Sequence, residues 1–283
     1  MNAKTELELA YDRLKEIHDL EYVLEDRIQL ASQPVYDKNT KLELSEVNIQ
    51  NKIKEMAKVI ASDTSFTNFV LIAVLDGALP FAEALRKELK ALMVNFQYAT
   101  IQAKSYIGMF SGELTIQSDS KVPVAGKKVL FADDVWDTGK TLDAIAKKAL
   151  SQHAVEIRNA VLVNKEPEKP RPYKAYTTYV GFTVPEDAFI IGYGLDFEGM
   201  LRNQESITVV DKKSLPNTQE QALLDSKVSV IKEIDRLKAN PVAEKSIGAS
   251  NSSTFSNPEL FFSHESKAPT QPPAESLIQQ GIK

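Results

Sequence analysis

The chain has 283 residues, of which 43% are hydrophobic, and it carries a formal net charge of −5 at pH 7. This size and apolar content are enough for one large domain or two small ones, and the acidic balance argues against binding to nucleic acid or to an anionic membrane surface. The chain contains no cysteine, which excludes disulfides and thiolate metal sites and suits a cytoplasmic protein.

The sequence gives no sign of membrane insertion or of a zinc site. No apolar run approaches the length of a membrane-spanning helix, and the N-terminus lacks the apolar core of a signal peptide. The histidines, His18, His153 and His264, are far apart in the sequence. We therefore expect any metal to be bound by oxygen ligands, as Mg²⁺ is.

Helical spacing of apolar residues dominates the first part of the chain. The pattern predicts one helix over about 5–31 and a second over 46–61, for which Ser45 is a suitable N-cap. We expect residues 1–44 to form an N-terminal helical segment that precedes a domain spanning 45–215.

Strand patterns alternate with helix patterns within this domain. The continuous apolar run at 69–75 is typical of a parallel strand covered on both faces, and Pro80 fits the first turn of a helix that ends near Leu89. Further elements are predicted downstream, with strands near 94–102, 128–133, 158–164, 177–182, 188–193 and 206–210 and a helix over 139–152. The alternation predicts an α/β fold with a twisted parallel sheet flanked by helices, in which ligands bind beyond the carboxyl ends of the strands.

The character of the chain changes near Pro216. Residues 219–238 have the pattern of one amphipathic helix, which we place in a segment spanning 216–240. Residues 241–283 are rich in Ser, Asn, Pro, Gln and Thr. Such a composition buries too little apolar surface to fold, so we expect a disordered tail there.

Residues 129–142 carry the strongest functional pattern. An apolar strand leads into Asp133 and Asp134, and an Asp-Thr-Gly-Lys-Thr turn at 137–141 then opens a helix. Small residues between a strand and a helix N-terminus offer backbone N–H groups to a phosphate, whereas the two carboxylates suit hydroxyl groups or a divalent cation. A ribose 5-phosphate combines both kinds of group.

Two alternatives explain this stretch less well. A nucleotide-binding P-loop would require glycine where the chain has Asp134. A strand, turn and helix without a ligand would leave Asp133, Asp134 and Asp137 to repel one another with nothing to bind.

The stretch resembles the phosphoribosyl-pyrophosphate (PRPP) signature of type I phosphoribosyltransferases, which has four apolar residues, two acidic residues, two apolar residues and then D-T-G-x-T. The resemblance implies the type I phosphoribosyltransferase fold, with a small hood and a mobile active-site loop. It also implies that Asp133 and Asp134 hold the ribose hydroxyls or a metal-bound water. The residues implied to cradle the 5′-phosphate are Thr138, Gly139, Lys140 and Thr141, and Asp137 is implied to belong to the same PRPP-binding set.

Further stretches are similar to 6-oxopurine phosphoribosyltransferases, the hypoxanthine-guanine enzymes, so that the likeness covers about residues 45–211. Residues 74–78 match the pyrophosphate loop, and residues 105–106 match the start of the flexible loop. Residues 161–165 match the purine-binding strand, and residues 189–203 match the base-stacking strand and the loop after it. The resemblance implies a purine salvage enzyme that transfers phosphoribose from PRPP to N9 of hypoxanthine or guanine with Mg²⁺, giving IMP or GMP and pyrophosphate. It also implies a homo-oligomer, either a dimer or a tetramer.

The resemblance and the chemistry of the transfer assign roles to single residues. Asp137 is the expected acid/base, which reaches N7 of the purine as the bond to N9 forms. Lys165 can donate a hydrogen bond to an exocyclic O6, a contact that the amino group of adenine disfavours. Asp76, Gly77 and Arg202 are implied to bind pyrophosphate, and Asp196 is implied to contact the metal together with Asp133 and Asp134. Phe189 is implied to stack on the base, and Ile190 to contact it through backbone groups. Ser105 and Tyr106 are implied to open the flexible loop.

Other interpretations stay open at this point. From the residues alone, Lys165 could end a strand at the surface and Phe189 could be ordinary core. Asp76 stands where many family members have lysine, which leaves the role of its side chain open, and Trp136 replaces a residue that is usually aliphatic.

Three other functions compete with purine salvage. The chain could use another base, such as xanthine or a pyrimidine, or it could be a non-catalytic regulator that senses PRPP on the same fold. The acidic balance and the joint presence of Asp137, Lys165 and Asp196 argue against such a regulator. The tail could also make the protein a scaffold or a delivered protein with a borrowed enzyme domain.

Overall fold

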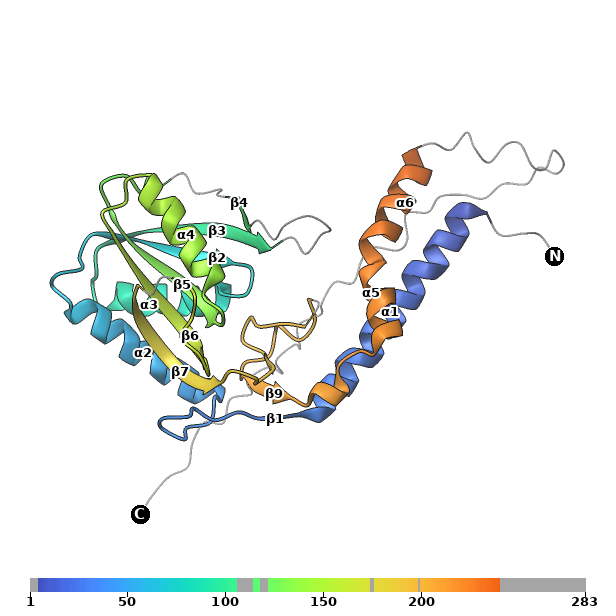
Figure 1. Ribbon diagram of the computed structural model, residues 1–283, viewed down its shortest axis with the longest axis horizontal. Helices are drawn as coiled ribbons and strands as arrows, with labels where there is room; N and C mark the ends of the chain where they lie inside the picture. Colours follow the sequence, from blue (N-terminus) through green and yellow to red (C-terminus); the bar gives the residue numbers. More distant parts are fainter. Residues whose placement is uncertain (1–4, 106–113, 118–121, 174–175, 198, 240–283) are drawn as a thin grey trace, which may run out of the picture.

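The computed structural model describes residues 5–105, 114–117, 122–173, 176–197 and 199–239. Its centre is a six-stranded sheet with the strand order β4-β3-β2-β5-β6-β7 (Figure 1). The strands are β2 (Phe69–Leu75), β3 (Phe96–Ser105), β4 (Leu114–Gln117), β5 (Lys128–Trp136), β6 (Glu156–Glu166) and β7 (Thr177–Pro185). All run parallel to their neighbours except β4, which pairs antiparallel with β3 at the edge. The predicted α/β fold with a parallel sheet is confirmed, and β4 is an additional strand.

Alternate residues of the central strands face two separate apolar cores. In β2, Leu71 and Ala73 pack with α2 (Glu46–Ser62) and α3 (Leu79–Ala91). Val70 and Ile72 point the other way and pack with α4 (Lys140–Ser151). Side chains of a strand alternate between the faces of its sheet, so a continuous apolar run must be covered on both sides. Helices on opposite faces provide this cover and leave the carboxyl ends of the strands for the loops of a site.

A small antiparallel sheet has the strand order β1-β9-β8. It consists of β1 (Ser32–Pro34), β8 (Ile190–Ile191) and β9 (Thr208–Val210). The sequence pattern did not predict β1, because three residues are too few to show an alternation. Its pairing with β9 joins the N-terminal part of the chain to a segment that follows the large sheet.

The buried carboxylate of Asp37 fastens the segment after β1 to the large sheet. One of its oxygens accepts a hydrogen bond from the N–H of Thr183 in β7 at 2.6 Å, and the other accepts one from the N–H of Thr40 at 2.7 Å. Burial alone would raise the pKa of Asp37, but the hydrogen bonds from Thr40 and Thr183 outweigh it and lower the pKa below its usual value.

Three helices form a helical arm, the name used here for α1 (Glu6–Ala31), α5 (Thr218–Asp225) and α6 (Lys227–Ala239) together. Figure 1 shows α1 alongside α5 and α6, and the arm extends away from the large sheet. The buried residues of α1 recur at helical spacing and are Ala10, Ile17, Leu24 and Ile28. Within the described ranges, the chain contains no helix of the length and apolar character needed to cross a bilayer.

The prediction of a single helix over 219–238 is wrong, because the chain breaks at Ser226 between α5 and α6. The hydroxyl of Ser226 donates to the carbonyl of Leu223 at 2.6 Å, a local bond that competes with the regular helix pattern. The break also changes which face is buried. Val230 is buried, whereas Val228, which a single helix would bury, is 62% exposed.

Candidate active site

The PRPP-like turn lies where β5 ends and α4 begins. The strand was predicted to end at residue 133 but continues to Trp136, so that the acidic pair lies inside it. Its extension follows from pairing with β6, which reaches Trp136 and Asn164. Gly139 is at the N-cap position of α4 with φ of 88°, a left-handed conformation that favours glycine. A Cβ there would also lie 3.0 Å from Nε1 of Trp136, so a side chain at this position would be crowded as well as strained.

A polar cavity of about 230 Å³ lies beside this turn. Its lining consists of residues 74, 75, 77 and 133–142, and therefore contains the acidic pair and the whole D-T-G-K-T turn. The residues predicted to bind the ribose and the 5′-phosphate are thus brought together around one space. Backbone N–H groups at a helix N-terminus next to carboxylates are the combination that a ribose phosphate requires.

Asp133 is buried, and Asp134 beside it is half-buried. Asp133 is only 6% exposed, and one of its oxygens accepts a hydrogen bond from the N–H of Asp134 at 3.2 Å. Burial raises the pKa of Asp133 well above its usual value, and the neighbouring charge of Asp134 adds to the shift. Burial also raises the pKa of Asp134, although the hydrogen bond from the N–H of Val135 at 2.9 Å and, less strongly, the charge of Arg202 oppose this effect. Two adjacent desolvated carboxylates are favourable only when hydroxyl donors or a cation compensate their charge.

The proposed pyrophosphate side converges on the same carboxylates. A Cβ on Gly77 would lie 2.0 Å from Oδ2 of Asp134, and a Cβ on Gly194 would lie 2.0 Å from the carbonyl oxygen of Gly77. The loop at Gly77 therefore lies directly against the side chain of Asp134, and the loop at Gly194 lies directly against the backbone of Gly77. Only glycine fits at these two positions.

Arg202 and Asp196 lie together at this side. Nη2 of Arg202 is 2.9 Å from Oδ1 of Asp196, and Nη1 donates to the carbonyl of Gly194 at 3.1 Å. The other carboxylate oxygen of Asp196 accepts a hydrogen bond from the N–H of Gly199 at 2.5 Å. The residue predicted to contact pyrophosphate and the one predicted to contact metal are thus direct partners.

Lys165 and Asp137 meet on the other side of the turn. Nζ of Lys165 lies 3.4 Å from Oδ2 of Asp137, although the two residues are 28 positions apart in the chain. The side chain of Lys165 is only 16% exposed, so the alternative that it ends a strand at the surface does not describe it. Lys165 lies within β6 rather than after it.

Phe189 and Ile190 lie apart from the polar cavity. The ring of Phe189 packs edge-on against Phe197 with their centroids 5.9 Å apart, and its side chain contacts the apolar cluster that includes the helical arm. Ile190 is buried in β8. Stacking of a purine on Phe189 stays a prediction.

Asp76 and the flexible loop complete the predicted set. Asp76 follows β2 with an exposed side chain, while its neighbour Gly77 lines the cavity. Ser105 is the last residue of β3, and Tyr106 lies outside the described residues. The predicted loop therefore stays a prediction.

Arg171 is a site residue that the sequence analysis missed. It lies in the segment between β6 and β7, and its guanidinium donates to the carbonyl oxygens of Trp136 at 2.9 Å and Asp137 at 2.6 Å. It also lies over the ring of Trp136, with its Cζ 4.0 Å from the ring centroid. A basic residue between Pro170 and Pro172 is the sequence signal that could have drawn attention to it.

The carboxylates fit a metal that arrives with its substrate. Among the described residues, no cluster of three or more acidic, histidine or cysteine side chains could hold a metal by itself. Mg²⁺ commonly binds through one or two carboxylates together with substrate phosphates and water. The desolvated pair of Asp133 and Asp134, with Asp196 on the pyrophosphate side, matches this donor set.

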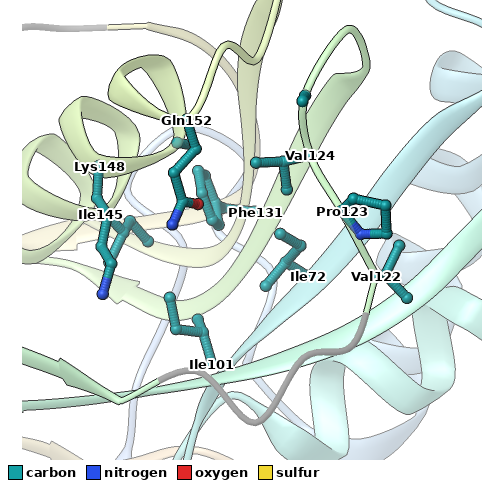
Figure 2. Close-up of a pocket in the computed structure, with 11 residues that line it drawn as sticks. Ile72, Ile101, Val122, Pro123, Val124, Phe131, Ile145, Lys148 and Gln152 are labelled. Atoms are coloured by element: carbon teal, nitrogen blue, oxygen red, sulfur yellow. The ribbon is translucent and has the colours of Figure 1, made fainter.

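A second cavity, of about 310 Å³, lies on the face of the sheet that α4 covers. Figure 2 shows Ile72, Ile101 and Phe131 of the sheet facing Pro123 and α4, with Lys148 on this helix and Gln152 directly after it. None of the residues predicted for the site is among the described residues that line it. The polar cavity therefore remains the candidate active site.

Comparisons with known proteins agree with this geometry. The phosphoribosyl transferase domain family matches residues 44–198. Hypoxanthine-guanine phosphoribosyltransferase of Bacillus subtilis is 34% identical over 171 residues, which are 60% of this chain and 92% of the relative. The corresponding protein of Aquifex aeolicus is 32% identical over 176 residues, which are 62% of this chain and 96% of the relative.

A solved structure agrees as well. Hypoxanthine phosphoribosyltransferase from Trypanosoma cruzi, in complex with the product IMP, has a TM-score of 0.56 at 27% identity and covers 65% of this chain and 96% of that one. The chain therefore belongs to the phosphoribosyltransferase family.

Proposed function

We propose that this protein transfers phosphoribose from PRPP to N9 of a 6-oxopurine, hypoxanthine or guanine, as an enzyme of purine salvage. The observation that carries the proposal is the contact between Lys165 and Asp137, 3.4 Å apart beside the phosphate-binding turn. It joins a donor suited to O6 of the base with a carboxylate suited to N7. The names of the similar proteins support the same substrates.

In the proposed reaction the bond from C1 of the ribose to pyrophosphate breaks and the bond from C1 to N9 forms. The turn at 138–141 holds the 5′-phosphate through backbone N–H groups. Asp133 and Asp134 bind the ribose hydroxyls, and their negative charge favours the positive ribose of the transition state. The carboxylate of Asp137 takes the proton from N7 of the base. Arg202 and the backbone at Gly77 bind the leaving pyrophosphate. Mg²⁺, bound together with PRPP, would neutralise part of its charge.

The choice of base follows from the donor at Lys165. An ammonium group donates hydrogen bonds and accepts none. It therefore matches the O6 acceptor of hypoxanthine, guanine or xanthine and mismatches the amino group of adenine. A site built to donate to an acceptor loses that hydrogen bond when a donor such as the amino group of adenine stands in the acceptor's place.

The direct test is a PRPP-dependent activity assay with Mg²⁺ and each of hypoxanthine, guanine, xanthine, adenine and uracil, run on the parent chain and on Asp137→Asn. The parent should use a 6-oxopurine, and the variant should lose about 10²–10⁴-fold in kcat with PRPP affinity nearly unchanged, because asparagine keeps the shape but cannot accept the proton. Asp19→Asn on α1, far from the cavity, is the matched control.

Three outcomes would contradict this proposal in different ways. Activity with uracil alone would favour a pyrimidine enzyme, and PRPP binding without turnover on any base would favour a sensor. Parental turnover by Asp137→Asn would remove this residue as the acid/base.

We also propose how the rest of the chain relates to this activity. Residues 45–215 would carry catalysis, flanked by the segments 1–44 and 216–240, with 241–283 as a tail outside the described residues. The working form would be a homo-oligomer in the cytoplasm, which the lack of cysteine suits.

A further inference from the structure

Arg171 occupies a central position between the two halves of the candidate site. It belongs to the segment that links β6 to β7, and prolines stand on both sides of it. Proline fixes the backbone φ angle and cannot donate a hydrogen bond. The backbone at 170–172 is therefore more restricted than three residues without proline would be.

The guanidinium donates to oxygens that belong to both halves. Towards the phosphate turn, Nε donates to the carbonyl of Asp137 at 2.6 Å and Nη2 to that of Trp136 at 2.9 Å. Towards the base side, Nη2 donates to the side chain of Asn164 at 2.7 Å and also to the carbonyl of Lys165. The planar fork of an arginine holds such acceptors in a fixed arrangement.

The position of Arg171 is fixed by packing as well. Its guanidinium lies over the ring of Trp136, with Cζ 4.0 Å from the centroid. A Cβ on Gly139 would lie 3.5 Å from Cδ of Arg171, so the aliphatic part of the side chain lies against the phosphate turn. Arg171 thus contacts the turn through its stem and through its head group.

Backbone pairing in the large sheet holds the two halves together only up to the last residue pair of β5 and β6. Pairing between β5 and β6 ends at Trp136 and Asn164. After this pair, the chain at Asp137 leaves the sheet to form the phosphate turn, whereas Lys165 continues in β6. Arg171 bonds to residues on both sides of the end of this pairing.

We infer that Arg171 is a positioning residue that sets the spacing between the 5′-phosphate turn and the base-binding lysine. The inference rests on the proposed function, because it assigns these two halves to the two ends of one nucleotide. A nucleotide spans both halves, whereas ribose 5-phosphate or a free base occupies only one. Loss of Arg171 should therefore weaken the binding of a nucleotide more than the binding of its pieces.

Lysine should not replace arginine here. Its ammonium is a compact charge without the planar fork, and it stacks less well on an aromatic ring. The variants to compare are Arg171→Lys, which keeps the charge, and Arg171→Met, which keeps approximate length without charge.

Arg158 provides a matched control on β6. Like Arg171 it stacks on an aromatic ring, with its Cζ 4.3 Å from the centroid of Phe66, and its side chain is 10% exposed. It donates to Glu156 at 2.8 Å and to Tyr179 at 2.6 Å, near the start of the strand rather than at the site. Arg158→Lys should lower the thermal stability without changing ligand binding.

The experiment measures Kd by calorimetry for IMP, ribose 5-phosphate and hypoxanthine on the full chain, and acrylamide quenching of fluorescence without ligand. Trp136 is the single tryptophan of the chain, so its emission reports on the stacked guanidinium directly. Both Arg171 variants should raise the Kd for IMP by about tenfold to a hundredfold. This fold-increase in Kd for IMP should exceed the product of the fold-increases for ribose 5-phosphate and for hypoxanthine. Quenching of Trp136 by acrylamide should also increase.

The outcomes separate this inference from a purely structural role. If both Arg171 variants only lower the melting temperature, as Arg158→Lys should, the inference is wrong. It is equally wrong if the loss for IMP equals the product of the losses for its pieces. If the parent chain binds no purine nucleotide, the proposed function fails, and the quenching measurement alone tests the role of Arg171. Stronger quenching of Trp136 by acrylamide in the Arg171 variants than in the parent would support a link between the two halves through Arg171. Equal quenching would overturn it.

Discussion

Asp133 and Asp134 place two carboxylates in a region from which water is largely excluded. Burial and mutual repulsion raise the pKa of Asp133 well above its usual value. In the folded chain without ligand, ionisation of this group is therefore unfavourable. A ligand that supplies hydroxyl donors or a cation relieves this cost, and the relief adds to the favourable free energy of binding.

Asp133→Asn should change how the stability of the protein depends on pH. A carboxyl group whose pKa is raised by folding contributes stability below its unfolded pKa and loses that contribution as the pH rises through the higher folded value. The melting temperature of the variant, relative to the parent, should therefore increase as the pH rises from 4 towards neutrality, and kcat/KM for PRPP should fall on the order of a hundredfold. Thermal unfolding across pH and steady-state kinetics measure the two effects.

Asp143 supplies the control for this prediction. It is also a buried aspartate, 3% exposed, but its Oδ2 lies 2.6 Å from Nζ of Lys147. Asp143→Asn removes an ion pair of a buried carboxylate and should lower the melting temperature relative to the parent. A flat difference between Asp133→Asn and the parent would contradict the view that this pair destabilises the folded chain.

Sequence patterns identified the residues of the cavity but missed the one that ties them together. Asp133, Asp134 and the turn at 137–141 stand in a fixed register along one stretch, so their proximity could be predicted. Three of the four acceptors of Arg171 are backbone carbonyls. Carbonyls are present at every position and carry no signature, so no pattern of side chains could indicate this contact.

Secondary-structure elements followed their apolar patterns where those patterns were long. β2 and α1 agree closely with prediction because each carries a clear period over its whole length. β5 continues through polar residues to Trp136 because its neighbour β6 offers backbone partners that far. At Ser226 the chain leaves the regular helix over a single residue, and apolar spacing does not encode so local an interruption.

The packing of α1 gives a test at the level of elements. Leu24 is fully buried in the cluster shared with α5 and α6, whereas Leu30 on the same helix is 86% exposed. Leu24→Ala should lower the free energy of unfolding by about 2–5 kcal/mol, and Leu30→Ala should change it by no more than about 0.5 kcal/mol. Urea denaturation gives the totals, and hydrogen exchange in α5 and α6 shows whether the loss is local. Equal effects of the two variants would mean that the cluster does not hold the arm together.

The residues proposed for catalysis span positions 76 to 202, inside or next to the stretch that matches the family at 44–198. A chain that ends at Ala239 keeps all of them and the helical arm. We expect its kcat/KM to stay within about twofold of the parent value, in line with the small effect of changes far from a site. Loss of activity in this shortened chain would show that the tail takes part in catalysis.

A chain that ends at Leu215 provides the comparison. It lacks α5 and α6, so the apolar face of α1 is uncovered. It also lacks Glu220, which lies 2.9 Å from Nη2 of Arg27 in the full chain. This second truncation should lower the melting temperature and promote aggregation, because an exposed apolar stripe favours self-association. Circular dichroism and light scattering on both truncated chains measure these outcomes.

The helical arm also has a consequence for synthesis on the ribosome. Arg27 and Glu220 are 193 residues apart, so α1 emerges first while its partners emerge only after almost the whole catalytic sheet. At about 5–20 residues per second, this interval is on the order of ten seconds or longer. During that time the apolar stripe of α1 is exposed on the nascent chain, and a ribosome-associated chaperone would have a continuous target there until the arm closes.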